Sequence, residues 1–187
     1  GALKKGEDGW VRGDDTREIP VPPTIAALLT ARLDRLTREE RRVIEPASVV
    51  GLTFGRGAVA AMTGVAAEGA LSTELSGLTR KQLVRPVLTS EGATVDEAFR
   101  FAHLLVRDAT YATLLKRTRA DLHERFVAWA DVANARAERG LEFEEILGWH
   151  LEQAYGYLIE LGTLDDHARR VGADGAARLA AAGRRAY

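Results

Sequence analysis

The imidazole of histidine is the side chain of this sequence best suited to metal binding or acid–base chemistry, because the chain contains no cysteine. Histidine occurs four times, as His103, His123, His150 and His167. The last three fall on separate predicted helices and lack the mutual spacing of metal ligands, so we interpret them as structural residues. We therefore predict no metal site, and His103 is the histidine to consider further.

Two pairs of neighbouring carboxylates, Glu144 with Glu145 and Asp165 with Asp166, are the next candidates for chemistry. Adjacent residues on a helix point in different directions, and each pair stands at a predicted helix start, where negative charge complements the helix dipole. The sequence also lacks the phosphate loop, the dinucleotide-binding glycine motif, the zinc-protease motif and the hydrolase serine motif. We predict that the chain has no catalytic residue and binds no cofactor of its own.

Composition limits the partners that the chain can attract. Of 187 residues, 46% are hydrophobic and 28% are charged, and 26 Lys and Arg against 27 Asp and Glu give a formal net charge of −1. A nearly neutral chain does not attract a polyanion through its net charge, which weighs against nucleic acid as the main partner. No apolar run approaches the roughly 20 residues that span a bilayer, and the first residues lack the apolar stretch of a signal peptide. We expect a cytoplasmic protein without membrane contact.

The N-terminal part predicts a lead-in segment over residues 1–23, followed by two helices. Trp10 and Val11 are the only plausible strand nucleus of that segment, so we expect an irregular stretch or a short hairpin. Pro23 suits a first helical turn. Thr37 and Glu40 predict a capping box for the second helix, which the proline at position 46 should kink or end early. The first helix carries an apolar stripe at helical spacing, formed by Ile25, Leu28, Leu29, Leu33 and Leu36.

Residues 24–103 predict a winged helix-turn-helix domain with a small β-hairpin wing. The chain breaks around Phe54, and helices are expected over about 58–62 and 67–77, the second presenting Leu71, Leu75 and Leu78. Short β-type runs over 83–88 and 99–101 predict a hairpin. Three helices followed by a hairpin is the order of a winged helix, in which the hairpin is the wing.

Residues 104–187 predict only helices, over about 104–115, 118–138, 144–161 and from 165 onward. Helix pairs of this length are typical of the start of an α-solenoid of tetratricopeptide type. Such an array needs about three repeats, so we expect it to continue beyond Tyr187. The predicted fold class is therefore mostly α.

A DNA-binding interpretation would use the basic residues at the exit of the third winged-helix helix. Arg80, Lys81 and Arg85 would contact phosphates there. The helix itself, over residues 68–75, carries two acidic residues and almost no side chain that reads bases. We therefore predict that this helix presents a solvent-exposed face, and we keep DNA binding as the alternative.

The segment after the second wing strand carries a resemblance to a known family. Residues 102–108 read AHLLVRD, and the pattern of His103, Leu105, Arg107 and Asp108 resembles the end of the winged-helix domain in STAND (NB-ARC-like) ATPases. Leu104 stands where the plant-type pattern has aspartate. The resemblance implies that His103 contacts the β-phosphate of ADP and holds the protein in an inactive state. The other interpretation is that His103 caps the following helix or fills a domain seam.

The resemblance covers nearly the whole chain, through residues 19–36, 48–54, 99–111 and 122–125. These segments are similar to those of bacterial adenylate cyclase-linked and LuxR-type regulators. The resemblance implies an upstream P-loop domain that binds ATP or ADP with Mg²⁺, attached through residues 1–23. It also implies downstream repeats, an output domain and a protein or small-molecule inducer.

The resemblance thus implies a non-catalytic regulatory segment of a signal-transduction ATPase. The winged helix would read the nucleotide state through His103, and the repeat helices would bias the same two-state equilibrium. The alternatives are a DNA-binding transcription regulator and a passive scaffold.

Overall fold

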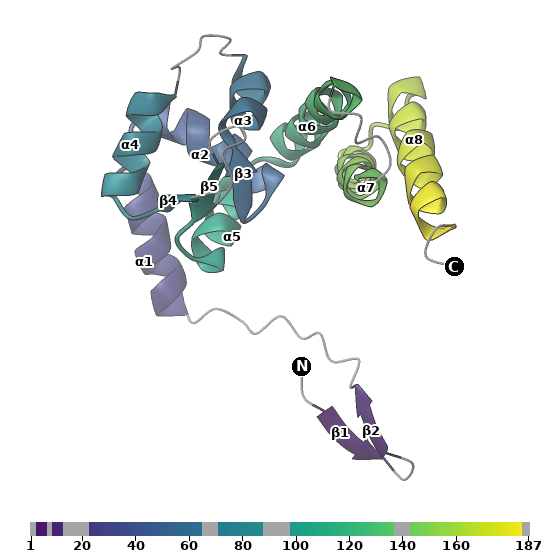
Figure 1. Cartoon of the computed structure of the whole chain (residues 1–187), viewed down its shortest axis with the longest axis horizontal. Coiled ribbons are helices and arrows are strands. Elements are labelled where there is room, and N and C mark those ends of the chain that lie inside the picture. Colours follow the sequence, from purple (N-terminus) through teal and green to yellow (C-terminus); the bar gives the residue numbers. More distant parts are fainter. Residues whose placement is uncertain are drawn as a thin grey trace.

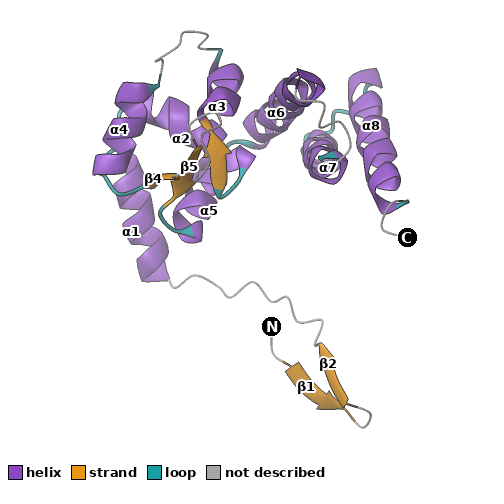
Figure 2. Ribbon diagram, viewed as in Figure 1, coloured by secondary structure: helices purple, strands orange, loops and turns teal. Residues whose placement is uncertain are grey.

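The computed structural model describes residues 3–6, 9–12, 23–64, 71–87, 98–136 and 143–184. Within these residues the chain is mostly helical, with a small three-stranded antiparallel sheet, as Figure 2 shows. The described helices include none that combines the length and the apolar character needed to cross a membrane. The prediction of a mostly α chain is confirmed.

The N-terminal segment contains a short hairpin. Strand β1 (Leu3–Gly6) pairs antiparallel with β2 (Gly9–Arg12), and Trp10 lies opposite Lys5. Of the two expectations for this segment, the hairpin is confirmed.

Helices α1 (Pro23–Asp34) and α2 (Arg38–Val50) begin where their capping signals predict. Pro23 opens α1. At the start of α2, the Glu40 amide donates to Thr37 Oγ1 at 3.2 Å, and the Thr37 amide donates to Glu40 Oε2 at 2.9 Å. The predicted capping box is therefore present, and it satisfies two amides that a helix start otherwise leaves without partners.

One of the two alternatives for α2 is contradicted, and the apolar stripe of α1 is covered unevenly. Helix α2 does not end early at Pro46, because the loss of one backbone bond is offset by burial of Pro46 and its neighbours against the core. The apolar stripe of α1 is only partly buried: Leu33 and Leu36 are covered, whereas Ile25 and Leu28 are 40% and 66% exposed. Helical spacing identifies one face of α1, but the rest of the described chain covers only its C-terminal half.

A three-stranded sheet forms from segments far apart in the sequence. Strand β3 (Thr53–Gly55) precedes α3 (Arg56–Thr63) and α4 (Ser72–Arg80), and β4 (Val84–Val87) and β5 (Ala98–Phe101) follow. The strand order is β3–β5–β4, with every neighbour antiparallel. The expected hairpin of β4 and β5 is confirmed, but β3 was expected only as a break around Phe54.

Helix α4 begins at Ser72, later than the expected start near residue 67, and residues 65–70 lie outside the described part. Its side chains Leu71, Leu75 and Leu78 are buried, as expected from their spacing. At Gly77, a Cβ atom would lie 2.8 Å from Glu40 Oε1. The missing side chain at that position therefore lets the capping carboxylate of α2 settle against α4.

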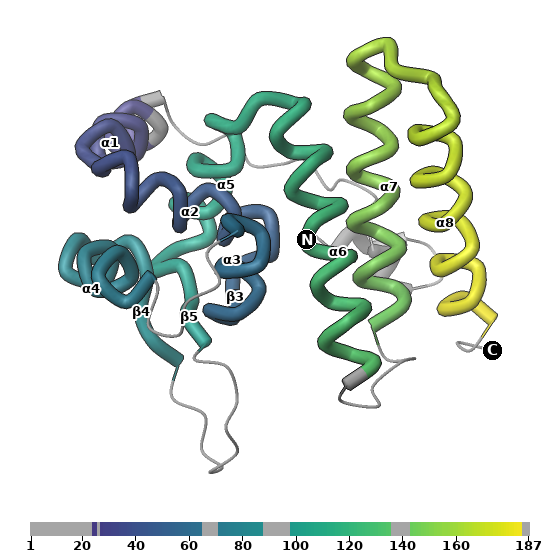
Figure 3. The backbone as a smooth tube through the Cα atoms, turned by 90° about the horizontal axis from the view of Figure 1, so that it is seen from above, coloured from purple at the N-terminus to yellow at the C-terminus, as the bar shows by residue number. Residues whose placement is uncertain are grey.

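The C-terminal part confirms the four predicted helices α5 (Leu104–Thr113), α6 (Lys116–Arg136), α7 (Glu144–Glu160) and α8 (Asp166–Gly183). Helix α5 packs on α1 and α2, whereas α6, α7 and α8 follow one another away from the sheet (Figures 1 and 3). Helices α7 and α8 approach closely, because a Cβ at Gly175 would lie 3.0 Å from Leu151 Cβ.

Two hydrophobic cores result. The first core lies between the sheet and helices α1, α2, α4 and α5, and includes Phe54, Leu78 and Phe101. The second core lies mainly among α6, α7 and α8, but Val49 of α2 and Met62 of α3 belong to it. The two halves of the chain therefore share buried surface at the junction of α2 and α3 with α6.

Candidate functional site

A buried pair of histidines occupies the contact between α6 and α7. His123 and His150 are 0% and 1% exposed, and their Nδ1 atoms lie 2.8 Å apart, within hydrogen-bond distance. The two residues are 27 positions apart, and the sequence did not predict that they meet. His167 lies elsewhere, on the exposed side of α8.

The pair belongs to a longer chain of hydrogen bonds. The hydroxyl of Tyr111 lies 2.9 Å from His123 Nε2 and 2.9 Å from the hydroxyl of Tyr157. Arg119 Nη1 donates to the Tyr157 hydroxyl at 3.3 Å. Because a guanidinium can only donate, one assignment of hydrogens satisfies every bond: Arg119 donates to Tyr157, which donates to Tyr111, then to His123 and finally to His150.

Burial keeps both imidazoles neutral near pH 7. Removal from water, the neighbouring His150 and the nearby cations Arg107 and Arg119 lower the pKa of His123 to about 3. Removal from water and Arg107 lower the pKa of His150 to about 4. Burial and the hydrogen bond with Tyr157 raise the pKa of Tyr111. Both imidazoles and the Tyr111 hydroxyl are therefore uncharged near pH 7.

Two arginines extend the hydrogen-bonded chain toward α2 and α5. Arg107 Nε donates to the carbonyl of Ser48 at 2.7 Å, and its guanidinium lies 4.8 Å from the centre of the Tyr111 ring. Arg119 lies on the same ring at 4.6 Å and donates from Nη2 to the Ala112 carbonyl at 3.1 Å. Cations over an aromatic face attract it. We call this assembly, Arg107, Tyr111, Arg119, His123, His150 and Tyr157, the seam cluster.

The seam cluster has the geometry of a hydrogen-bonded relay, and its two imidazoles do not have the geometry of a shared zinc site. Two nitrogens 2.8 Å apart are too close to share a zinc ion tetrahedrally, since each Zn–N bond is about 2.0–2.1 Å. Among the described residues, no group of three or more His, Cys, Asp or Glu side chains could hold a metal. The cluster connects α2, α5, α6 and α7 through directional hydrogen bonds. These bonds form only when the four helices pack as they do in this structure.

His103 caps helix α5. Its Nδ1 accepts a hydrogen bond from the Leu105 amide at 3.1 Å, and its backbone is extended, as at an N-cap. The side chain is exposed. Of the two interpretations made from the sequence, capping is therefore seen directly, and the nucleotide contact remains a prediction.

The basic residues at the end of α4 do not form one free surface. Lys81 Nζ pairs with Glu40 Oε2 at 2.5 Å and lies 3.4 Å from the Arg35 carbonyl. Arg85, on β4, lies opposite Arg100 of β5, and both are exposed, as is Arg80. Lys81 is thus occupied within the protein, while Arg80 and Arg85 remain accessible to a phosphate.

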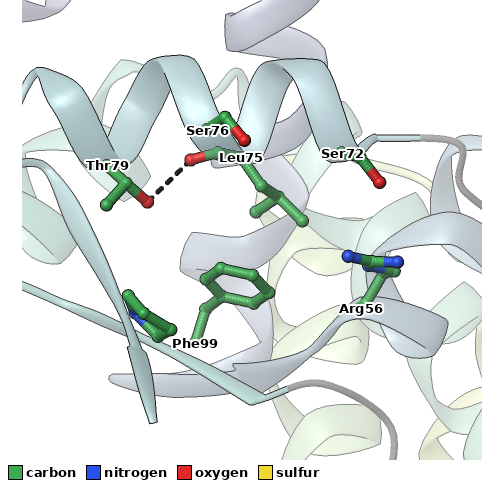
Figure 4. Close-up of a pocket in the computed structure, with 7 residues that line it drawn as sticks. Arg56, Ser72, Leu75, Ser76, Thr79 and Phe99 are labelled. Carbon is green, nitrogen blue, oxygen red and sulfur yellow. Dashed lines mark hydrogen bonds between the residues drawn. The ribbon is translucent and has the colours of Figure 1, made fainter.

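A cleft of about 320 Å³, which the sequence did not predict, separates α4 from the sheet. Figure 4 shows Leu75 and the ring of Phe99 facing each other across it, with Arg56 at one end. Its polar lining comes from Arg56 and from hydroxyls on one face of α4, and the Thr79 hydroxyl donates to the Leu75 carbonyl at 2.8 Å. The cleft could hold a small polar group.

Comparison with known proteins adds no relative: no family model, no curated protein and no solved structure matches the chain.

Proposed function

We propose that the chain is a non-catalytic regulatory segment of a STAND-type signalling ATPase, which couples the nucleotide state of an upstream P-loop domain to downstream repeats and an output domain. The observation that carries the proposal is the seam cluster. It joins α2 and α5 of the first core to α6 and α7 of the second through buried, directional hydrogen bonds. Coupling between two sites needs an element of this kind, whose arrangement both sites can bias.

The order of elements supports the two modules of the proposal. Helix α2, strand β3, helices α3 and α4 and the hairpin of β4 and β5 follow one another as in a winged helix, with β5 central in the sheet. Helices α6, α7 and α8 pack in sequence order, α6 on α7 and α7 on α8, as the helices of a repeat array do. In the proposed parent protein, ATP or ADP with Mg²⁺ belongs to the upstream domain.

His103 would be the residue through which the bound nucleotide affects the seam cluster. It caps α5, and Arg107 and Tyr111 follow it on the same helix at intervals of four residues. Residues at this spacing share one face of a helix. A displacement of the α5 N-terminus by a bound phosphate would therefore move the two residues through which α5 enters the seam cluster.

The test measures ADP release from the full-length protein with two substitutions at one position. His103→Ala removes both the cap and the imidazole, whereas His103→Asn keeps a side chain that caps helices well but cannot carry the positive charge of an imidazolium. A fluorescent ADP analogue reports the release rate. If His103 holds the β-phosphate, both variants release ADP faster. Release that stays at the wild-type rate in both variants contradicts the proposed role.

The alternative function is DNA binding, and one observation favours it. Arg85 and Arg100 are exposed side by side across β4 and β5, and neither forms a side-chain ion pair within the described residues. Fluorescence anisotropy with short duplexes tests this alternative. Binding that weakens steeply with salt and is lost in Arg85→Glu would favour a transcription regulator over a coupling segment.

A further inference from the structure

The cleft between α4 and the sheet has a cationic end and apolar walls. Figure 4 shows the guanidinium of Arg56, from the start of α3, at the same end of the cleft as the hydroxyl of Ser72. Leu75 of α4 and the ring of Phe99 of β5 face each other across the middle. The volume of about 320 Å³ falls within the roughly 300–1,000 Å³ that small-molecule sites occupy. The cleft can therefore take a small ligand with one polar end and an apolar body.

The wall that α4 contributes carries hydroxyls at helical spacing. Ser72, Ser76 and Thr79 are four and three positions apart, so they share one face of the helix. The Thr79 hydroxyl is engaged by the Leu75 carbonyl, whereas those of Ser72 and Ser76 make no hydrogen bond within the described residues. A hydroxyl can donate to an anion. The two serines can therefore bind a ligand oxygen without giving up a bond inside the protein.

The charge that faces the cleft is positive. Among the described residues that line it, Arg56 alone is charged. Arg85 and Arg100 are each next in sequence to a residue of the lining, and they point to the other face of the sheet, because side chains alternate along a strand. Glu74, the acidic residue of α4, stands two positions from each lining serine and lies on the opposite side of the helix. An anion in the cleft would meet a cation without passing a carboxylate of α4.

We propose that the cleft binds a small aromatic carboxylate. The carboxylate would pair with Arg56 and accept a hydrogen bond from Ser72, and the aromatic ring would lie between Leu75 and Phe99. Arg56 also interacts within the chain, but a guanidinium has five N–H donors and can hold a ligand as well. One guanidinium balances one negative charge, so a carboxylate fits better than a phosphate dianion. The inference does not depend on the proposed regulatory role, since it uses only this cleft.

The test titrates benzoate into the whole ¹⁵N-labelled chain and follows the backbone amide signals by NMR. We expect saturable shifts at Ser72–Thr79 and at Phe99, and a Kd that rises at least about tenfold, equivalent to 1.4 kcal/mol, in Arg56→Gln. Arg80→Gln is the matched control, because Arg80 is exposed on α4, does not line the cleft and loses the same charge. The control should keep the wild-type Kd.

A second pair of variants tests the cleft without changing Arg56. Ser72→Leu removes the hydroxyl and fills the cationic end of the cleft, so benzoate should no longer bind. Thr73→Leu introduces the same side chain at an exposed position of α4 that does not line the cleft, and it should bind benzoate as the wild type does. Circular dichroism confirms that each variant is folded, and if Arg56→Gln does not fold, the comparison of Ser72→Leu with Thr73→Leu decides.

Two further ligands separate the two parts of the proposed ligand. Benzamide has the shape of benzoate without its charge, and inorganic phosphate has charge without a ring, so both should bind more weakly than benzoate. Absence of saturable shifts with benzoate, equal weakening in the two control variants, or binding of benzamide or phosphate at least as tight as that of benzoate would each overturn the proposal.

Discussion

The two cores of the chain accommodate polar side chains in opposite ways. In the first core, the buried hydroxyls of Ser48 and Thr110 donate to carbonyls of their own helices, and Glu40 lies at the edge with Thr37 and Lys81. The second core contains a hydrogen-bonded pair of imidazoles whose partners come from other helices. The buried polar groups of the first core are thus bonded within their own helix or lie at its edge, whereas the second core depends on the protonation of a histidine pair at its centre.

This difference has a physical consequence for coupling. Apolar packing tolerates small shifts of one helix against another, because dispersion forces are not directional. A chain of hydrogen bonds weakens steeply when donors and acceptors lose alignment, and a buried donor without a partner costs about 1–3 kcal/mol. The seam cluster should therefore resist partial displacement of one helix against another.

The largest expected effect concerns the shape-dependent first core. Phe101 is fully buried and packs against Phe54, with ring centres 5.5 Å apart. Phe101→Ala should lower the free energy of unfolding by about 3–5 kcal/mol, because it leaves a cavity that the sheet cannot close. Urea unfolding measures the loss, which should be equal at pH 7 and pH 5. Arg100→Ala, at the exposed neighbour, should change stability by less than about 0.5 kcal/mol, and a loss of similar size there would contradict this view.

The next effect concerns protonation of the second core. The pKa values of His123 and His150 lie near 3 and 4 in the folded chain, below the ordinary 6.5 of the unfolded chain. As pH falls below 6.5, the unfolded chain binds protons first, so the stability from neutral imidazoles is complete above that pH and declines toward pH 4. We expect a loss of roughly 3 kcal/mol between pH 7 and pH 5.

Carboxylates limit the pH window in which this effect can be seen. The hydrogen bonds from Lys81 and from the Thr37 amide outweigh burial and lower the pKa of Glu40, so its contribution is lost only below pH 4.5. Burial raises the pKa of Glu45, which opposes the histidine effect. Urea unfolding from pH 7 to pH 5 is therefore the measurement, with the double substitution His123→Leu and His150→Leu as control. An unchanged pH dependence in that variant would contradict the assignment.

The sequence predicts the elements whose signals are local. The ends of α6 and α7 and the start of α8 follow from apolar spacing and turn residues, and the capping box of Thr37 and Glu40 needs only four consecutive residues. Strand β3 could not be predicted in this way. Its three residues are too few to show a period, and they form a strand because Phe54 pairs with Phe99, 45 positions later by the difference of the two residue numbers.

The contact between His123 and His150 could not be predicted from local sequence signals either. Each histidine of the buried pair lies on a helix with an ordinary amphipathic pattern, and no spacing relates positions on two different helices. Their contact depends on how α6 crosses α7 and on the side-chain rotamers of His123 and His150. The available signal was that both histidines fall near the apolar faces of their helices, beside Leu122 and Leu151. This pattern favours burial but names no partner.

The smallest expected effect removes one oxygen from the seam cluster. Tyr111→Phe keeps the ring that Arg107 and Arg119 contact but deletes the hydroxyl that joins His123 to Tyr157. We expect a loss of about 1–2 kcal/mol, because two buried polar groups lose a partner. The tautomer of His123 should also become mixed, since no donor then fixes Nε2 as the acceptor.

Tyr155→Phe is the matched control for this substitution. Tyr155 lies on α7 and packs its ring near Gly172, but its hydroxyl makes no hydrogen bond within the described residues. Urea unfolding gives the stability of both variants, and ¹⁵N shifts of the imidazole nitrogens report the tautomer. If both variants lose the same stability and the His123 shifts are unchanged in Tyr111→Phe, the hydroxyl does not order the seam. If only Tyr111→Phe mixes the tautomers, Arg119 sets the direction in which each hydrogen bond of the seam cluster is donated. The second core then differs from the first in having hydrogen bonds that all run in one direction.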